Sequence, residues 1–366
     1  MKLNVGDEVS FYTLVHKIGG GGFGEIWKVK SSEDDRHYAM KLESSQASRH
    51  TLNFETSVLK KLQFCDKFPI FKMDGNDSGY YFLVMELCGP NLSTIAQRLP
   101  NGHFTRENMH LLFYEMLTIL EQFHRTGYVH RDIKPQNFVT RFNGNSPIVL
   151  IDYGISKLYV NSQNQHIEAR GHAAAIGSLL YSSPNTADHM ELSRRDDLYS
   201  LVYSVLDIGG VPLPWRGAMD PSEAGELKKA NPISKLMEPF GPGFVEVAKH
   251  IESLNYADAP NYPRMKEWAI HGANKSAVFQ WMTTPSNDPQ FLHLATSNHL
   301  NFDPTGILLE LSPYMVSGKK TQQKGKKPAN THPARKRLTV NQNSTSEPVQ
   351  PGMDGDEPEG KKCVIC

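Results

Sequence analysis

The feature that most constrains this chain is a pair of short polar segments near its middle. Residues 130–137 read His-Arg-Asp-Ile-Lys-Pro-Gln-Asn, and residues 152–154 read Asp-Tyr-Gly. In that order they offer a proton acceptor (Asp132), a cation (Lys134) and two oxygen ligands for a metal (Asn137 and Asp152). In-line transfer of a phosphoryl group from ATP to a hydroxyl needs these parts in one place. The chain must therefore fold so that the two segments meet.

Charge and composition argue against a nucleic-acid-binding fold. The 366 residues carry 39 basic and 39 acidic side chains, and ten of the basic and five of the acidic ones lie after residue 317. Residues 1–317 therefore carry 29 basic against 34 acidic groups, whereas nucleic-acid-binding domains concentrate positive charge on the fold. We expect a mildly acidic globular part with a basic tail, acting as a monomer and without a nucleic-acid partner.

Cysteine content and hydropathy indicate a cytoplasmic protein. The four cysteines are too few for a disulfide framework, and two of them, Cys65 and Cys88, stand isolated among apolar residues. The first ten residues are polar and lack the apolar core of a signal peptide. No stretch approaches the ~18 consecutive apolar residues of a membrane span.

Hydrophobic periodicity predicts an α+β fold with a small β-rich lobe followed by a larger helical lobe. Strand patterns occur at 11–18, 25–30, 38–42 and 80–87, with one helix at 49–62. After residue 89 the pattern is helical, most clearly in the amphipathic stretch 105–125, where Thr105 is the expected N-cap. Further helices are predicted at 197–208, 222–230, 244–254 and 262–270.

The composition changes abruptly after about Pro313. Polar residues, Lys, Pro and Gly dominate there and aromatic residues vanish, so residues 316–366 are predicted to be disordered. The stretch 285–315 keeps enough Phe and Leu to dock on a domain, but its pattern predicts no particular element.

A glycine run between the first two strands is a candidate phosphate-binding loop. It consists of Gly19, Gly20, Gly21, Gly22, Phe23 and Gly24 and contains Gly-x-Gly-x-x-Gly. Small residues let backbone N–H groups approach phosphates, although such a run alone is more often a flexible hairpin. A strand follows the run instead of a helix, and this favours a loop that covers a nucleotide over a dinucleotide-binding fold.

Lys41, at the end of the third strand, is a candidate ligand of the α- and β-phosphates. Glu55, on the helix predicted at 49–62, would fix its rotamer. Each residue alone would read as an ordinary surface charge. Together with Asp132, Lys134, Asn137 and Asp152 they predict a site for ATP and Mg²⁺, because hard oxygen ligands suit Mg²⁺.

These motifs resemble those of eukaryotic protein kinases, and within them those of the casein kinase I group. The group resemblance is carried by Ser193-Arg194-Arg195-Asp196-Asp197-Leu198, by Leu213-Pro214-Trp215, and by Ser183-Pro184-Asn185. The stretches 17–26 and 58–63 are similar to the tau-tubulin kinase branch. The resemblance implies a two-lobed kinase domain over 11–284, with an N-lobe of about 11–87 and a C-lobe of about 89–284.

The resemblance implies a serine/threonine kinase that acts on protein substrates. It makes Met85 the gatekeeper and Glu86, Leu87 and Cys88 the hinge that binds the adenine edge. It assigns further nucleotide contacts to Ile18, Ile26 and Ala39, and it implies that Asp197 braces the catalytic loop. The branch generally needs no phosphorylation of its activation segment. A pseudokinase scaffold is the alternative, and it would be favoured by loss of Lys41, Asp132, Asn137 or Asp152, all of which are present.

Three positions depart from the group pattern. Tyr153 replaces the usual Phe and adds a hydroxyl that needs a partner. Leu180 stands where the group has an Arg that helps bind a phosphate on pre-phosphorylated substrates. A preference for such primed substrates is therefore not expected. Pro184 is also unusual, and none of the three removes a catalytic group.

The last four residues, Cys363-Val364-Ile365-Cys366, fit the prenylation pattern. One prenyl chain binds membranes weakly, and the basic cluster between Lys319 and Arg337 could add attraction to an anionic membrane surface. The alternatives are half of a zinc site, cysteines placed by chance, and, for the basic cluster, a nuclear-import patch.

Overall fold

The computed structural model describes residues 3–21, 24–141, 146–274 and 279–280. All of these residues belong to one compact unit. The expected extension at 285–315, the tail 316–366 and Cys363 lie outside the described residues. Gly22 and Phe23, at the tip of the glycine run, also lie outside them.

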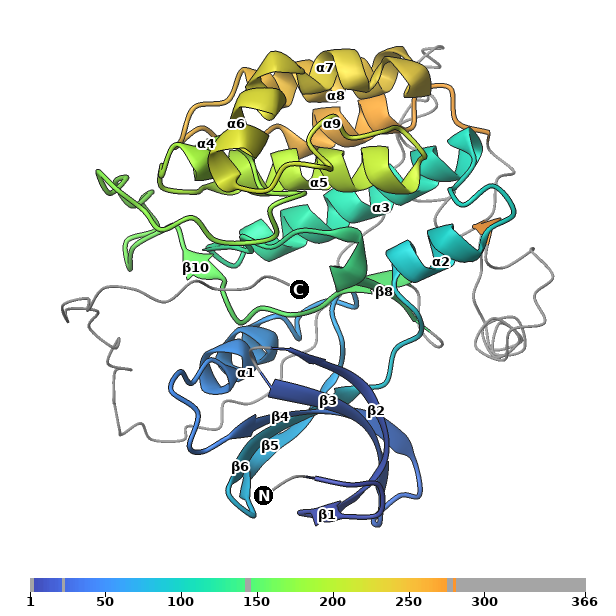
Figure 1. The fold of residues 1–366 in the computed structure, drawn as a ribbon, viewed down its shortest axis with the longest axis vertical. Helices are drawn as coiled ribbons and strands as arrows, with labels where there is room; N and C mark the ends of the chain where they lie inside the picture. Colours follow the sequence, from blue (N-terminus) through green and yellow to red (C-terminus); the bar gives the residue numbers. More distant parts are fainter. Residues whose placement is uncertain (1–2, 22–23, 142–145, 275–278, 281–366) are drawn as a thin grey trace, which may run out of the picture. The chain divides into compact units, whose positions relative to one another are not determined.

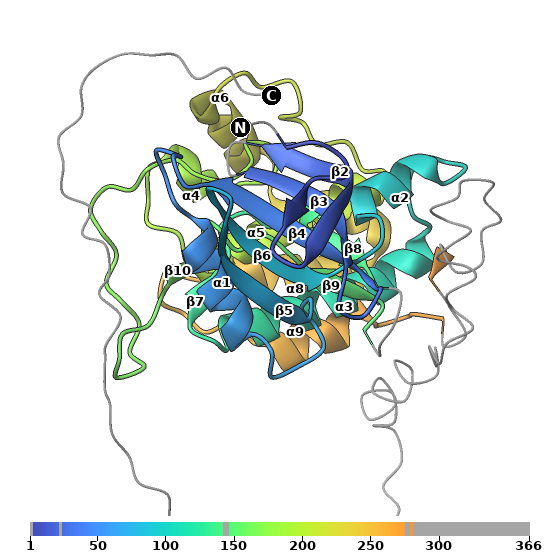
Figure 2. The same ribbon diagram turned by 90° about the horizontal axis from the view of Figure 1, so that it is seen from below.

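The first part of the chain is an antiparallel sheet of six strands in the order β1-β2-β3-β4-β6-β5 (Figure 1). The strands are β1 (Glu8–Val9), β2 (Tyr12–Gly21), β3 (Gly24–Ser31), β4 (His37–Ser44), β5 (Phe71–Asp77) and β6 (Tyr80–Glu86). Helix α1 (Leu52–Lys61) packs on β4, β5 and β6 and lies alongside the sheet in the view from below (Figure 2). One buried apolar cluster belongs to this sheet alone.

The rest of the described chain is mainly helical (Figure 1). Its helices are α2 (Leu92–Arg98), α3 (Arg106–His124), α4 (Pro184–Ala187), α5 (Arg194–Ile208), α6 (Pro221–Ala230), α7 (Ile233–Leu236), α8 (Pro242–Glu252) and α9 (Tyr262–Ala269). Between α3 and α4 run β7 (Tyr128–Val129), η1 (Pro135–Asn137), β8 (Phe138–Thr140), β9 (Ile148–Leu150) and β10 (Lys157–Leu158), and η2 (Glu238–Phe240) precedes α8.

Local sequence accounts for the main helix starts. Thr105 caps α3 through its side chain, which accepts a hydrogen bond from the backbone of Asn108. Asp220 caps α6 in the same way and is followed by Pro221, whose fixed φ suits the first helical position. Helices α3 and α5 are apolar almost all round, and both run through the middle of the largest buried cluster.

The predicted fold class is confirmed: a β-rich lobe precedes a helical lobe. Each predicted helix has a counterpart, displaced by a few residues at its ends. The strands around the glycine run extend further into it than predicted, to Gly21 and from Gly24. The β-type run at 148–151 corresponds to β9, whereas strand β5, helices α2, α4 and α7, and the short strands β1, β7, β8 and β10 were not predicted. Within the described residues, no helix is long and apolar enough to cross a membrane.

Arg141, which follows β8, ties the helical part to the end of the sheet. Its Nε and Nη2 atoms donate to the two carboxylate oxygens of Glu86 at 2.8 and 2.6 Å. Its guanidinium also donates to the backbone oxygens of Asp66 and Phe68. The Arg141 side chain is 2% exposed, so the pair is shielded from water. One buried cation therefore holds two separate segments, residues 66–68 and Glu86, beside the end of β8.

Replacing Arg141 with Met should lower the free energy of unfolding by about 3 kcal/mol, because the Glu86 carboxylate, only 16% exposed, and the backbone oxygens of Asp66 and Phe68 would lose their donor. Urea denaturation would measure this change. Arg264→Met is the matched control, since the Arg264 side chain is half exposed in its pair with Glu267. The control should change the free energy by no more than about 0.5 kcal/mol. Equal changes in the two variants would contradict the role given to Arg141.

Candidate functional site

A triplet of charged side chains, of which Lys41 and Glu55 are buried and Asp152 is partly exposed, joins the sheet to the segment that follows β9. Lys41, on β4, is 5% exposed, and its Nζ lies 2.6 Å from Glu55 Oε2 and 3.0 Å from Asp152 Oδ1. Burial alone would lower the pKa of Lys41, but the two carboxylates outweigh it and raise the pKa. Burial raises the pKa of Asp152, but Lys41 outweighs it and holds the pKa below its usual value. Lys41 and Asp152 therefore form a charged pair.

Glu43 sets the position of Glu55. The Glu43 side chain leaves the same strand as Lys41, and its Oε2 accepts hydrogen bonds from the backbone N–H groups of Thr51 and Leu52 at 3.0 and 2.8 Å. These N–H groups lie at the start of α1, where the helix dipole favours an anion. Helix α1 is thus anchored so that Glu55, in its first turn, reaches Lys41. The sequence analysis did not single out Glu43.

The loop at 130–137 gathers its polar side chains around Asp132. Lys134 Nζ lies 2.7 Å from Asp132 Oδ2 and 3.1 Å from the Ser178 hydroxyl. Ser178 donates its backbone N–H and its hydroxyl to Asp132 Oδ1 at 3.0 and 2.8 Å. The Asn137 amide donates to the backbone oxygen of Asp132 at 2.8 Å. Asp132 is therefore held in one orientation from three sides.

Asp197, at the start of α5, holds the backbone of the same loop. It accepts hydrogen bonds from the backbone N–H groups of His130 and Arg131 at 2.7 and 2.8 Å. It also accepts one from His124 Nε2 at 2.8 Å. Arg131 adopts a φ of +69°, which is a strained conformation for a residue with a side chain. The bonds to Asp197 stabilise this turn and so fix where Asp132 points.

A backbone hydrogen bond brings Asn137 close to Asp152. The N–H of Ile151, the residue before Asp152, donates to the backbone oxygen of Asn137 at 2.9 Å. The Asn137 amide nitrogen is used by the loop, which leaves its Oδ1 as the atom to face a cation. One carboxylate and one amide oxygen fit Mg²⁺, which binds few protein oxygens and takes its other ligands from phosphates and water. In the described part of the chain, no cluster of three or more His, Cys, Asp or Glu could hold a metal unaided.

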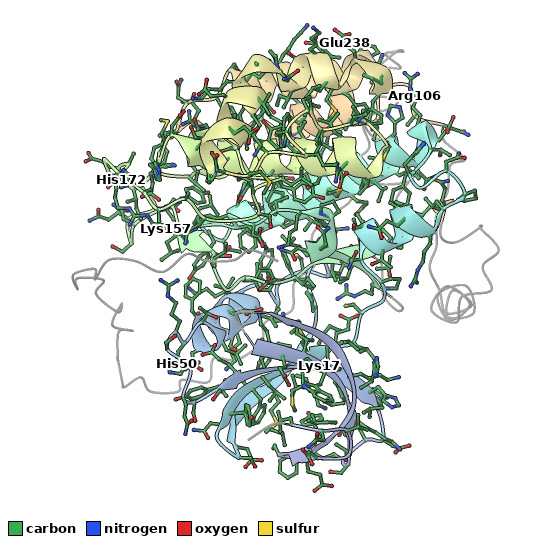
Figure 3. All side chains as sticks on the ribbon, in the orientation of Figure 1. Lys17, His50, Arg106, Lys157, His172 and Glu238 are labelled. Carbon is green, nitrogen blue, oxygen red and sulfur yellow. The ribbon has the colours of Figure 1, made fainter. Side chains whose placement is uncertain are left out.

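The glycine run forms a tight hairpin between β2 and β3, with Gly19, Gly20 and Gly21 paired to Ile26, Glu25 and Gly24. Gly24 has a φ of +121°, and a Cβ atom there would lie 2.2 Å from the backbone oxygen of Leu42. No other residue fits at this position. Lys17 on β2, labelled in Figure 3, pairs with Glu25 across the hairpin, and Ile18 is exposed.

The strand register groups the predicted adenine-binding residues. Ala39 pairs directly with Met85, and Lys41 pairs with Ile26 on one side and with Leu83 on the other. Because side chains alternate along a strand, Ala39 and Lys41 face the same side of β4. Leu87 and Cys88 follow directly after β6 and are half-buried. The Glu86 side chain is taken by Arg141, so only its backbone is left for a hinge contact.

Tyr153 has the partner that its hydroxyl requires. The ring is 2% exposed and stacks on Phe123 at a centroid distance of 5.8 Å. Its hydroxyl donates to the backbone oxygen of Leu150. The substitution therefore keeps a buried aromatic side chain and adds a local hydrogen bond.

Besides Glu43, two further residues escaped the sequence analysis. Ser178 belongs to none of the motifs, and the only signal beside it in the sequence is the preceding glycine. Gly177 has a φ of +85°, and a Cβ atom there would lie 2.5 Å from the Arg131 backbone oxygen, so this position requires glycine. Glu191 is 3% exposed and pairs with Lys157 and Arg170, which pins the segment beyond β10. Lys157 lies at the edge of the molecule in Figure 3.

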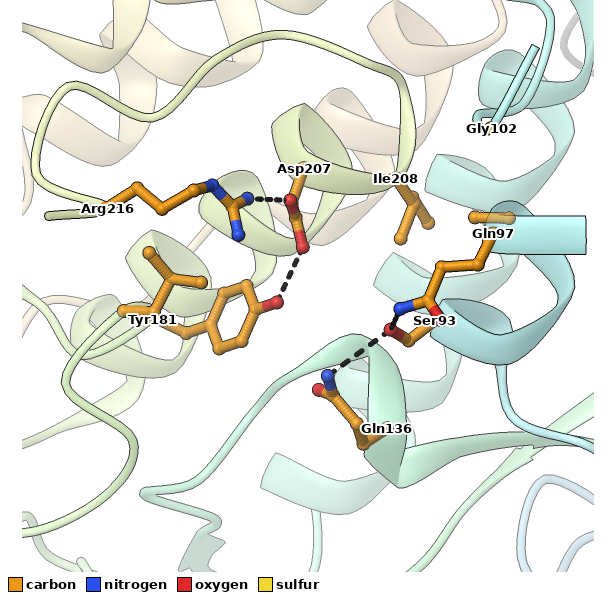
Figure 4. Close-up of a pocket in the computed structure, with 10 residues that line it drawn as sticks. Ser93, Gln97, Gly102, Gln136, Tyr181, Asp207, Ile208 and Arg216 are labelled. Carbon is orange, nitrogen blue, oxygen red and sulfur yellow. Dashed lines mark hydrogen bonds and ion pairs between the residues drawn. The ribbon is translucent and has the colours of Figure 1, made fainter. Parts of the chain in front are cut away.

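A cavity of about 420 Å³ lies beside the catalytic loop. Gln136, next to Asn137, forms part of its wall, together with Leu180, Tyr181 and residues of α2 and α5 (Figure 4). Inside it, Asp207 accepts hydrogen bonds from Arg216 and from the Tyr181 hydroxyl. The cavity therefore has polar groups in its wall, and Gln136 of the catalytic loop borders it.

Comparisons with known proteins agree with this geometry. The model of the protein kinase domain matches residues 12–247. A probable serine/threonine-protein kinase of Dictyostelium discoideum is 34% identical over 277 residues, covering 74% of this chain and 56% of that protein. A probable casein kinase I homologue of Encephalitozoon cuniculi is 33% identical over 268 residues, covering 70% of this chain and 82% of the homologue. The chain thus spans little more than half the length of the first relative. It belongs to the protein kinase family.

Proposed function

We propose that this protein is a serine/threonine kinase that transfers the γ-phosphoryl group of ATP to hydroxyl groups of protein substrates. The observation that carries the proposal is the convergence of Lys41, Glu55 and Asp152 in one ion triplet. The two relatives, whose names describe a serine/threonine kinase and a casein kinase I homologue, favour this substrate class and a casein-kinase-I-like enzyme. The likeness to the tau-tubulin kinase branch rests on the sequence motifs.

Each residue of the site has a role that its contacts support. Asp132, oriented by Ser178 and Lys134, is placed to accept the proton of the substrate hydroxyl. Lys134 adds positive charge where the transferred group gains negative charge. Lys41 would hold the α- and β-phosphates, with Glu55 keeping it extended. Asn137 and Asp152 would hold Mg²⁺, which neutralises phosphate charge when bound.

A pseudokinase scaffold is the competing function. It would keep the fold and a nucleotide-binding surface but would lack one of the four groups Lys41, Asp132, Asn137 and Asp152. All four are present, and hydrogen bonds to neighbouring side chains hold Lys41, Asp132 and Asp152 in the site. We therefore favour the active enzyme.

Asp132→Asn should lower kcat for phosphate transfer to casein by on the order of 10²–10⁴-fold, because the amide cannot accept the hydroxyl proton. ATP affinity, measured by calorimetric titration, should stay within about threefold, since Asp132 is assigned no nucleotide contact. Asp35→Asn is the control, because the Asp35 side chain is 85% exposed. An Asp132→Asn variant as active as the control would refute the assignment.

Peptides that carry a phosphate upstream of the target serine should gain little in kcat/KM over unphosphorylated ones. Leu180 offers no charge, and the nearby Arg216 is paired with Asp207. Leu180→Arg should raise kcat/KM for the phosphorylated peptide by about tenfold, as expected for one charge-assisted contact. A strong preference of the unaltered protein for phosphorylated peptides would overturn this prediction.

A chain that ends at Cys366 carries a prenyl acceptor at Cys363, and we propose that it anchors the kinase to membranes together with the basic tail. Cys363→Ser should move the protein from the membrane fraction to the soluble fraction of cells. Cys366→Ser is the matched control, since it keeps the acceptor cysteine and a permitted last residue. Identical fractionation of all three proteins would discard the anchor.

A further inference from the structure

Lys228, on α6, is a buried lysine that the site described above does not use. It is 3% exposed, and among the described residues it forms no ion pair with a carboxylate. Its neighbour Lys229 is exposed and pairs with Asp188 and Glu226. Burial lowers the pKa of Lys228 to about 7. Burying a cation without a counter-charge costs free energy, so the hydrogen bonds and ring contacts of the Lys228 ammonium must offset that cost.

The Lys228 ammonium makes three hydrogen bonds to a single short segment. Its Nζ lies 2.7 Å from the backbone oxygen of Leu179, 2.7 Å from that of Ser182, and 3.3 Å from the Ser182 hydroxyl. These bonds use all three N–H groups of the ammonium. The ammonium also lies 5.6 Å from the ring centroids of Tyr203 and Trp215, within the range of cation–π attraction. These contacts stabilise the ammonium form and offset part of the effect of burial.

The segment that Lys228 holds, residues 178–182, connects Asp132 with the cavity. It begins at Ser178, which donates to Asp132. Leu180 and Tyr181 then line the cavity (Figure 4). The Trp215 indole N–H donates to the backbone oxygen of Leu180 at 2.7 Å, and Tyr181 donates to Asp207 at 2.6 Å. With Lys228, three side chains from outside the segment therefore fix four consecutive residues.

We propose that Lys228 is a positioning residue for the protein substrate: its ammonium fixes residues 179–182 as the surface on which the polypeptide beside the target hydroxyl is bound. The proposal rests on the kinase activity proposed above and adds a residue that touches neither ATP nor the reacting hydroxyl. Lys228 contacts the segment at carbonyl oxygens, whereas Asp132 is held separately by Ser178 and Lys134. Loss of Lys228 should therefore weaken substrate binding more than it slows transfer.

Lys228→Met removes the three donors while keeping most of the apolar stem. The KM for casein should rise about tenfold or more, because carbonyl groups left unpaired let the segment rearrange. The KM for ATP and kcat should stay within about threefold. Lys229→Met on the same helix is the matched control and should leave all three constants unchanged. An unchanged KM for casein, or a loss confined to kcat, would overturn the proposal.

Hydrogen–deuterium exchange on the full chain provides a readout that does not depend on activity. Amides of residues 179–183 should exchange at least about tenfold faster in Lys228→Met than in Lys229→Met. If Lys228→Met does not fold, Trp215→Phe takes its place, since it removes the donor to Leu180 from the same segment and should also raise the KM for casein. A kinase with no transfer activity in any form would refute the proposed function, whereas unchanged exchange in a folded Lys228→Met variant would refute the role of Lys228.

Discussion

The ion triplet of Lys41, Glu55 and Asp152 is the interaction on which the rest of the site depends. It connects a strand, a helix and the segment after β9, which lie far apart in the sequence. Removing Lys41 would leave the buried Glu55 carboxylate without its counter-charge, and such losses cost about 3–5 kcal/mol. The arrangement of α1 against the sheet and the charge state of Asp152 are therefore coupled. Glu43 supports the coupling by anchoring the first turn of α1.

A second group of contacts organises the side of the site that faces the substrate. Asp197 holds the backbone turn at Arg131, and Ser178 and Lys134 orient Asp132. From Ser178 the chain continues into the segment held by Lys228 and Trp215. Asp132 thus stands between two separately anchored regions, which the proposed function assigns to the nucleotide and to the polypeptide. Because the two regions are anchored by different residues, a substitution can change the contacts of one region and leave those of the other in place.

The features that could be predicted from the sequence are those that depend on rare residue types at fixed spacing or on a long periodic pattern. The Asp-x-Lys-x-x-Asn run and the later Asp-Tyr-Gly predicted a convergence that the structure displays, and the periodicity of residues 105–125 predicted α3. The contributions of Glu43, Ser178, Glu191 and Lys228 were not predictable in the same way. Each is a common residue type, and its role comes from contacts with residues distant in the chain. Short elements such as α7 and β10 were missed because too few residues carry their pattern.

Tyr153 has a consequence for ligands that act by displacing the aromatic side chain that follows Asp152. To leave its place on Phe123, the ring must also break the bond from its hydroxyl to the Leu150 oxygen. That bond contributes about 1 kcal/mol, which corresponds to about fivefold in affinity. Inhibitors that require an outward-turned residue 153 would therefore bind this kinase more weakly than a relative with Phe there, while compounds that leave the ring buried would not distinguish the two.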